Sequence, residues 1–467
     1  MHFYMKKDLL WERISLLVIV CFTFLTMYYY DNQIKFVEAI INMHRIAAGK
    51  WYYLLNGWSA IPYGVILQGI TAIWAVPVFI LSEFGVISVT SVGARLWYKL
   101  FMLIFLLLST EQTGKIAAKT GMTSEKRILW LKLFFLSSLL VLLPAVHIAQ
   151  IDIVYLFFVL KGIEYYIDDE HFKFLLCFMV AVPGKYMPLF IFIPFVLLKE
   201  KRYLYIIRDL AVGCALCVVD KGMNSVGYRI EQHLGIDPAL ELMQNDTMQQ
   251  CWEDLLSSGI NAFGVPVSLV LCAFFILCIW CFLRKSEDRK KLAVWVSFLG
   301  FSILFVLGAS SPYWIIILIP FEMLLIFENS PDFGALFPME IIFSAAYVYT
   351  FILRVPWIFG SQDTFDFLLF RYIPGYEGRI HGFVSDFISQ RGLDSYSGVA
   401  SAMLVACIVG IAMVTYPLKK GVPDKECITS DERENNYIRG WYWARIGLAC
   451  GWILLNIWVV ALNHVAA

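Results

Sequence analysis

Long runs of hydrophobic residues recur from residue 10 to the end of the chain, with short charged or polar segments between them. The hydrocarbon core of a bilayer is about 30 Å thick, so a helix that crosses it needs about 20 apolar residues. The pattern therefore predicts an all-α membrane protein with about 11–14 transmembrane helices. The clearest runs lie at residues 15–30, 128–143, 153–167, 174–182, 189–198, 203–219, 265–283, 293–308, 315–327, 336–353, 399–416 and 441–465.

Residues 31–60 interrupt this pattern and are predicted to form the first outer loop. Isoleucine and valine recur there at helical spacing, with polar side chains such as Lys35 and Glu38 between them. This arrangement is typical of an amphipathic helix that lies in the membrane interface, and Trp58 would anchor the loop at headgroup level. Residues 61–110 hold two further apolar runs, of which we expect one to be re-entrant or to lie along the surface.

The composition supports a membrane protein and excludes several other classes. Hydrophobic residues make up 60% of the chain, charged residues 16%, and the mean hydropathy is +0.70, whereas a soluble domain has about 45–50% apolar and about 25% charged residues. The apolar runs leave no room for a separate soluble domain, so residues 1–467 are predicted to form a single transmembrane domain. A net charge of zero argues against nucleic acid as a partner.

The distribution of basic residues predicts which loops lie on which side of the membrane. Lysine and arginine concentrate on the cytoplasmic side of membrane proteins, and clusters at residues 199–202, 284–291 and 419–439 are therefore expected inside. This topology places two long loops, 220–261 and 354–395, on the outer face. Long loops in a compact protein are usually functional.

The same topology gathers polar residues at the outer ends of the helices and leaves the helix interiors apolar. Glu322 is expected close enough to a cytoplasmic end to reach water. A transporter more often places its ionisable groups near the midplane, at broken helices, so this asymmetry favours chemistry at the outer surface. The outer set comprises Asp31, His44, Arg45, His147, Gln150, Asp152, Lys185, Ser310, Tyr313, Arg371, Arg379 and His381.

Residues 143–152 concentrate much of this polarity in a short connection between two apolar runs. His147, Gln150 and Asp152 lie here. An ionisable residue at the mouth of a membrane helix is costly, which favours a functional interpretation. Because aspartate is also a favoured helix N-cap, Asp152 has a purely structural alternative, and the two roles do not exclude each other.

Four short motifs resemble one family of membrane enzymes. An acidic residue follows the first helix, and later segments resemble a G-Q-x-D element, a K-x-x-P element and an H-P-x-Y…P helix. Together they are similar to the integral membrane glycosyltransferases of the GT-C superfamily, in the mannosyltransferase-like branch that uses polyprenyl-phosphate sugars. The motifs are Asp31, Gln150-Ile-Asp152, Gly184-Lys185-Tyr-Met-Pro188 and Ser311-Pro-Tyr-Trp-Ile-Ile-Ile-Leu-Ile-Pro320.

The chain departs from the family pattern at three points. Ala149 stands where the pattern has glycine, Ser311 stands where it has histidine, and the first loop has Asp31-Asn32 rather than Asp-x-Asp. The missing second acid leaves the metal requirement open: no cofactor is firmly expected, and a divalent metal remains an alternative.

The resemblance assigns roles to the outer polar residues. Glycosyl transfer to a hydroxyl needs a base for the acceptor proton, and arginine or lysine best stabilises a departing phosphate. The resemblance implies that Asp31 is the base and that Asp152, with Gln150, orients the acceptor or the sugar. Lys185 would contact the donor phosphate. The further candidates for substrate binding are His44, His147, Tyr313, Arg371 and Arg379.

The implied activity is an inverting transfer of mannose or a similar hexose or pentose from a polyprenyl-phosphate donor to a lipid-linked or cell-surface glycan. Nucleotide sugars are made in the cytoplasm and do not cross unaided, so an outer-face enzyme needs a lipid-linked donor. The expected location is the plasma (inner) membrane of a bacterium, with the site on the extracytoplasmic side. The alternatives are a transporter or flippase of a lipid-linked saccharide and a non-catalytic scaffold.

Overall fold

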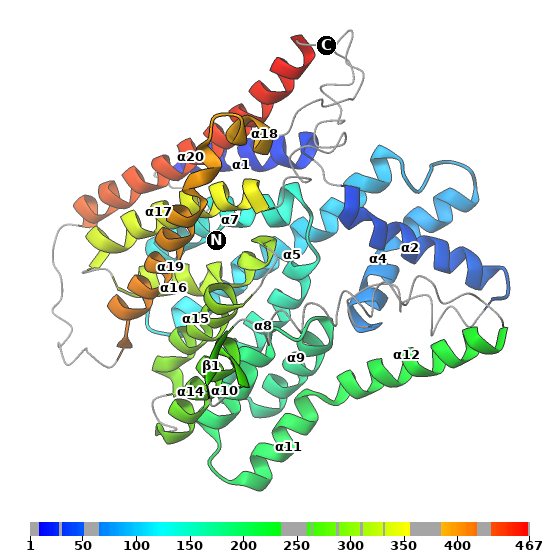
Figure 1. Ribbon diagram of the computed structural model, residues 1–467, viewed down its shortest axis with the longest axis horizontal. Helices are drawn as coiled ribbons and strands as arrows, with labels where there is room; N and C mark the ends of the chain where they lie inside the picture. Colours follow the sequence, from blue (N-terminus) through cyan, green and yellow to red (C-terminus); the bar gives the residue numbers. More distant parts are fainter. Residues whose placement is uncertain are drawn as a thin grey trace, which may run out of the picture. The chain divides into compact units, whose positions relative to one another are not determined.

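The computed structural model describes residues 9–27, 30–50, 65–234, 259–262, 265–285, 289–308, 312–329, 332–354, 384–417 and 431–465. This part of the chain is mainly helical (Figure 1). It divides into two compact units, each assembled from segments that are distant in the sequence: residues 1–30, 121–150 and 312–467 form the first, and residues 31–120 and 151–311 form the second.

The first unit packs helices from both ends of the chain around a central bent segment. In Figure 1, α17 and α19 lie side by side. Its elements are α1 (Leu10–Thr26), α6 (Glu125–Ser137), α7 (Leu139–Val141), a π-helix (Leu142–His147), a 3-10 helix (Pro312–Ile317), α16 (Ile319–Glu328), α17 (Phe333–Arg354), α18 (Val384–Ser389), a 3-10 helix (Leu393–Tyr396), α19 (Ser397–Val414) and α20 (Asp431–Val465).

The second unit is built on α8 and α9, a pair of buried helices. Aromatic rings fill its core, with Phe178 stacked on Phe192 and Tyr166 stacked on Phe195. Its elements are α2 (Tyr30–Ala47), α4 (Val65–Glu83), α5 (Val92–Lys119), α8 (Asp152–Ile167), α9 (His171–Gly184), α10 (Leu189–Lys199), α11 (Tyr203–Gly213), α12 (Ala215–Leu234), β1 (Gly259–Ala262), β2 (Val265–Ser268), α14 (Leu269–Leu283) and α15 (Arg289–Leu307).

The prediction of a membrane protein dominated by helices is confirmed. Four helices are long and apolar enough to cross a bilayer: residues 66–83, 92–119, 333–353 and 393–414. A fifth candidate is the bent pair Glu125–Ser137 and Leu139–His147. Several other predicted spans form apolar helices of 10–17 residues, such as α9 and α10, so length and composition alone support four or five spans among the described residues.

The predicted amphipathic helix exists as α2, which buries Phe36, Ala39 and Ile40 along one side.

The first helix, α1, ends at Thr26 rather than at residue 30. The aromatic residues 51–60 lie outside the described part of the chain. Both apolar runs of the ambiguous region become membrane-length helices, α4 and α5.

The long loop predicted at residues 220–261 is partly regular structure. Helix α12 continues to Leu234, and β1 begins at Gly259. Strand β1 pairs with β2 in an antiparallel hairpin, with Gly259 opposite Ser268 and Ala262 opposite Val265. The hairpin is a small exception to the all-α prediction. Of the second long loop, only α18 and part of the following 3-10 helix fall in the described part.

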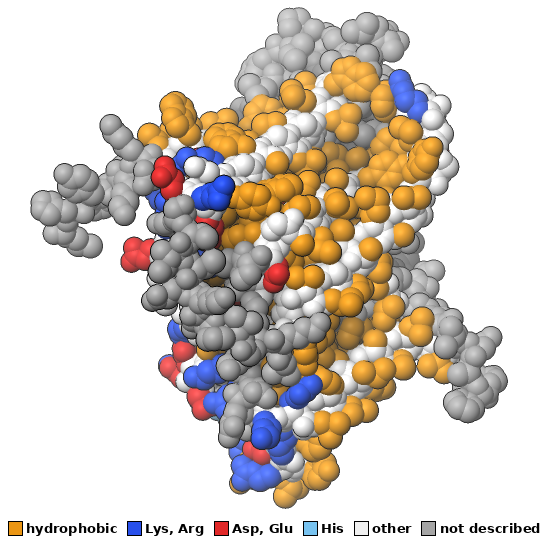
Figure 2. All heavy atoms as spheres, turned by 90° about the vertical axis from the view of Figure 1, so that its left-hand side faces the viewer, with side chains coloured by type: hydrophobic (Ala, Val, Ile, Leu, Met, Phe, Trp, Pro, Cys, Tyr) orange, Lys and Arg blue, Asp and Glu red, His pale blue; other side chains and the backbone are white. Residues whose placement is uncertain are grey.

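Many apolar side chains are exposed on the outside of the helices, as expected for surfaces that face lipid. Ile73 is 75% exposed, Leu204 81% and Met413 67%. Figure 2 shows that hydrophobic side chains cover much of one face, while charged side chains occur in clusters. A soluble protein rarely exposes apolar patches of this extent.

Candidate functional site

The predicted run at residues 128–143 is a broken helix rather than a straight one. Helix α6 ends at Ser137, Ser138 is extended, and the chain resumes at a bend of 56°. Pro144 cannot donate a backbone hydrogen bond to the preceding turn, and the segment Leu142–His147 widens into a π-helix. Such π-segments are frequent at functional sites.

The turn after the π-helix contains a residue in an unusual backbone conformation. Ala149 has φ of 55°, in the left-handed region that favours glycine. The resemblance drawn from the sequence has glycine at this position. The turn therefore takes, at an alanine, a backbone conformation that glycine adopts more readily.

Asp152 and Lys185, from two separately identified motifs, form an ion pair. The Lys185 ammonium donates to Asp152 Oδ1 at 2.8 Å. The Asp152 side chain is fully buried, and that of Lys185 is 13% exposed. Asp152 is the first residue of α8, and Lys185 directly follows the end of α9. Thus 33 residues of chain separate two side chains that meet at one end of a helix pair.

Asp152 does not act as a helix cap. The N-cap of α8 is Ile151, and no side chain provides a capping hydrogen bond there. Instead, one carboxylate oxygen accepts from Lys185, and the other makes no hydrogen bond within the described residues. Tyr98 of α5 lies within electrostatic range of the same carboxylate. The pair therefore combines a buried carboxylate oxygen, which makes no hydrogen bond within the described residues, with a partly exposed lysine side chain.

Neighbouring side chains hold the pair in place. The Tyr155 hydroxyl donates to Met187 Sδ at 3.7 Å, linking α8 to the segment after Lys185. A Cβ added at Gly184 would lie 3.5 Å from Tyr155 and 3.6 Å from Leu67 of α4. The backbone beside Lys185 is therefore closely packed, which limits the positions that the ammonium can take.

His44 lies at the other end of α4 from this ion pair. Its Nδ1 contacts Glu83, and its Nε2 is 3.2 Å from Ser82 Oγ. Leu67, beside Gly184, is 16 residues from Glu83, which at 1.5 Å per residue is about 24 Å along the helix. The Ser82 hydroxyl also lies 2.8 Å from the Phe79 carbonyl oxygen, to which it can donate.

The remaining predicted site residues are distributed over the two units. Asp31 is the second residue of α2, and its side chain is outside the described set, as are all of Arg371 and Arg379. Gln150 is buried in the first unit, and its Oε1 has no hydrogen bond within the described residues. Tyr313 lies half-buried in the 3-10 helix Pro312–Ile317, with its ring at right angles to that of Trp314. The roles of these residues remain predictions.

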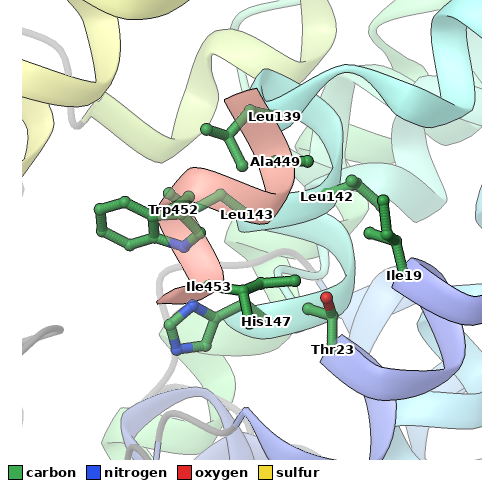
Figure 3. A pocket seen from close by; sticks show the side chains of 9 residues that line it. All are labelled: Ile19, Thr23, Leu139, Leu142, Leu143, His147, Ala449, Trp452 and Ile453. Carbon is green, nitrogen blue, oxygen red and sulfur yellow. The ribbon is translucent and has the colours of Figure 1, made fainter. Parts of the chain in front are cut away.

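His147 lines a small cavity in the first unit, together with Thr23 and Trp452 (Figure 3). The other lining residues are apolar and come from α1, the bent segment and α20. The cavity volume is about 10 Å³, room for about one water molecule. His147 is fully buried there, so this cavity is too small to be the predicted sugar site.

Sequence reasoning missed a cluster of buried charges in the first unit. Glu322 does not reach water as expected: it is fully buried, as are Glu340 and Arg445. The only signal in the sequence is a single charge within each long apolar run. Among the described residues, no three histidine, cysteine, aspartate or glutamate side chains are arranged to hold a metal ion.

Comparison with known proteins yields no similarity: no protein-family model, curated protein or solved structure matches this chain. The resemblance to GT-C glycosyltransferases therefore rests on the short motifs and stays a prediction.

Proposed function

We propose that the protein is an inverting glycosyltransferase that moves a sugar from a polyprenyl-phosphate donor to a lipid-linked or cell-surface glycan. The carrying observation is the buried ion pair between Asp152 and Lys185, which joins the two motifs that resemble the family's G-Q-x-D and K-x-x-P elements. The left-handed backbone of Ala149 supports the first of these motifs independently of its residue letters.

Lys185 supplies the positive charge that the reaction needs. In the transfer, the bond between the sugar's anomeric carbon and the phosphate oxygen breaks, and its electrons leave with the polyprenyl phosphate. A bond to the acceptor oxygen forms on the opposite face, and the acceptor proton passes to a base. The ammonium of Lys185, whose side chain is 13% exposed beside Asp152, stabilises the departing phosphate.

Asp152 holds Lys185 in position and orients a hydroxyl of the acceptor or the sugar. Its second carboxylate oxygen is available for that hydrogen bond, since it makes none within the described residues. The resemblance assigns the base to Asp31. In this proposal the 11–14 crossings form a GT-C-like fold in which the polyprenyl tail lies against exposed apolar helices, with the site on the outer face of a bacterial plasma membrane.

The test is transfer of radiolabelled sugar from polyprenyl-phosphate donors to endogenous glycolipid acceptors in proteoliposomes. Wild type is compared with Asp31→Asn, with a neutral pair at positions 152 and 185, and with a matched control. The control neutralises Lys119 and Glu164 of the second unit, whose charged atoms are 2.8 Å apart. Their other charged partners, Asp168 and Lys161, then remain as one anion and one cation. We expect transfer in the wild type and the control only. Folded wild-type protein that transfers no sugar from any lipid-phosphate donor contradicts the proposal.

The second candidate function is a transporter or flippase of a lipid-linked saccharide. Two observations favour it: the 56° break between α6 and α7 and the buried charges Glu322, Glu340 and Arg445. Broken helices and intramembrane ionisable residues are typical of transporters. Movement of a fluorescent lipid-linked saccharide across the vesicle membrane, without formation of a glycosidic bond, would favour this function over transfer.

A further inference from the structure

Three ionisable side chains from three helices meet in the interior of the first unit. Glu322 comes from α16, Glu340 from α17 and Arg445 from α20, with exposed fractions of 0%, 1% and 3%. Glu340 is the eighth residue of α17, about 10 Å from the start of that membrane-length helix at 1.5 Å per residue. A charged side chain at this depth is costly and is by default a candidate for function.

Arg445 lies against Glu340, one of the two carboxylates. Its Nη2 is 3.3 Å from Glu340 Oε1, and the Ser344 hydroxyl donates to the same oxygen at 2.9 Å. The other end of the guanidinium faces Met323 Sδ at 3.4 Å, and its carbon lies 4.9 Å from the centre of the Phe134 ring. The arginine is therefore enclosed by one carboxylate, a thioether and an aromatic face.

Glu322 is within electrostatic range of both Glu340 and Arg445, yet neither of its oxygens makes a hydrogen bond within the described residues. Glu340 Oε2 likewise has no such hydrogen bond. Two carboxylates therefore face one guanidinium. If all three groups were charged, the buried cluster would carry a net charge of −1, and an uncompensated buried ion costs several kcal/mol.

Among the described side chains around α16, Arg445 is a cation within electrostatic range of Glu322. Helix α19 brings the thiol of Cys407 into electrostatic range of Glu322. Helix α6 contributes the Phe134 ring, and its Arg127 is directed at Glu434 at 4.0 Å. Lys132, also on α6, is half-buried and has an interaction partner of its own.

We propose that Glu322 is a proton-binding site, in which one proton neutralises the excess negative charge of the cluster. A neutral carboxylic acid avoids the cost of a second buried anion and gains an O–H donor. Loss of the proton leaves an unbalanced buried charge, so its release requires water or a cation at the carboxylate. This inference does not depend on the proposed sugar transfer.

Infrared spectroscopy of the full-length protein in lipid nanodiscs tests the proposal. The C=O stretch of a protonated carboxyl is distinct from the bands of a carboxylate. At pH 7 we expect one such band in the wild type, shifted after incubation in D₂O, and no such band in Glu322→Gln. Because glutamine copies the shape of a neutral glutamic acid, this variant is expected to melt within about 3 °C of the wild type. A wild type without the band, or a Glu322→Gln protein that keeps it, overturns the proposal.

Glu340→Gln tests the charge balance of the same cluster. With Glu340 neutral, Arg445 needs a counterion, and Glu322 becomes that counterion by giving up its proton. Glu340→Gln should fold and lack the carboxylic acid band. The double variant Glu322→Gln/Glu340→Gln leaves Arg445 without a counterion, so its equilibrium constant for folding should fall at least a hundredfold. A band that persists in Glu340→Gln, or a double variant as stable as the wild type, shows that another group balances Arg445 and overturns the charge count.

Discussion

The ion pair of Asp152 and Lys185 allows stability and function to be separated by charge-neutral substitution. Lys185→Gln leaves the fully buried Asp152 carboxylate without its cation. Breaking one partner of a buried pair costs about 3–5 kcal/mol, whereas neutralising both removes the pair without stranding a charge. We therefore expect the single variant to be strongly destabilised and Asp152→Asn/Lys185→Gln to be nearly as stable as the wild type.

The loss of folding stability can be compared directly between the single and the double variant. At about 1.4 kcal/mol per factor of ten, a loss of 3 kcal/mol lowers the folding equilibrium more than a hundredfold. The double variant should recover most of that loss, because the amide oxygen introduced at position 152 can accept a hydrogen bond from the amide nitrogen introduced at position 185. Thermal unfolding in detergent, followed by tryptophan fluorescence, measures both variants.

The assay of sugar transfer then decides whether the pair is more than structural. We expect the folded double variant to lose transfer by at least about a hundredfold, since one lost charge contact to a developing anion costs about 3–4 kcal/mol. The control variant, in which Lys119 and Glu164 are neutralised, should retain sugar transfer. A double variant that is stable and transfers sugar at the wild-type rate would refute the assignment of Lys185 to the donor phosphate.

Three further predictions concern the scaffold and are each measured by thermal unfolding. Ala149→Gly should change stability by less than about 1 kcal/mol, because relief of about 1–2 kcal/mol at φ 55° offsets the lost methyl group and the added chain entropy. Gly300→Ala should destabilise by about 1–3 kcal/mol, because the new Cβ would lie 2.5 Å from the Phe190 carbonyl oxygen. The hydrogen bond from Lys199 lowers the pKa of Asp169, so Asp169→Asn should destabilise at neutral pH, and its difference from wild type should close as the pH falls below about 4.

The hydrophobic pattern was sufficient to predict the class of fold and most helix positions. Apolar runs such as residues 153–167 and 189–198 correspond closely to α8 and α10. The pattern could not predict that residues 128–143 bend at Ser138, because the bend depends on the extended backbone of one polar residue within an otherwise uniform run. It also could not separate two units whose segments alternate along the chain.

The residues of the candidate site could be predicted from the sequence only where a charged residue lay within one of the motifs. Asp152 and Lys185 each stand out at a helix end, and the structure pairs them. Glu322 and Glu340 do not stand out, because a single acid in an apolar run resembles a side chain that reaches for water from a helix end. Their burial follows from the packing of α17 and α20 around α16, which depends on contacts between distant segments.

For the proposed sugar transfer, the geometry of the motif residues is a form of support that does not depend on the residue letters. Motifs of four or five residues recur by chance in a chain this long, and a chance match carries no expectation about backbone angles or long-range contacts. Here the position expected to be glycine has φ of 55° although it is alanine, and the lysine of one motif reaches the aspartate of the other. A purely structural ion pair would explain the contact between Lys185 and Asp152. It would not explain the left-handed backbone of Ala149. The conjunction therefore favours a functional role for the turn, which the neutral pair at positions 152 and 185 tests without unfolding the protein.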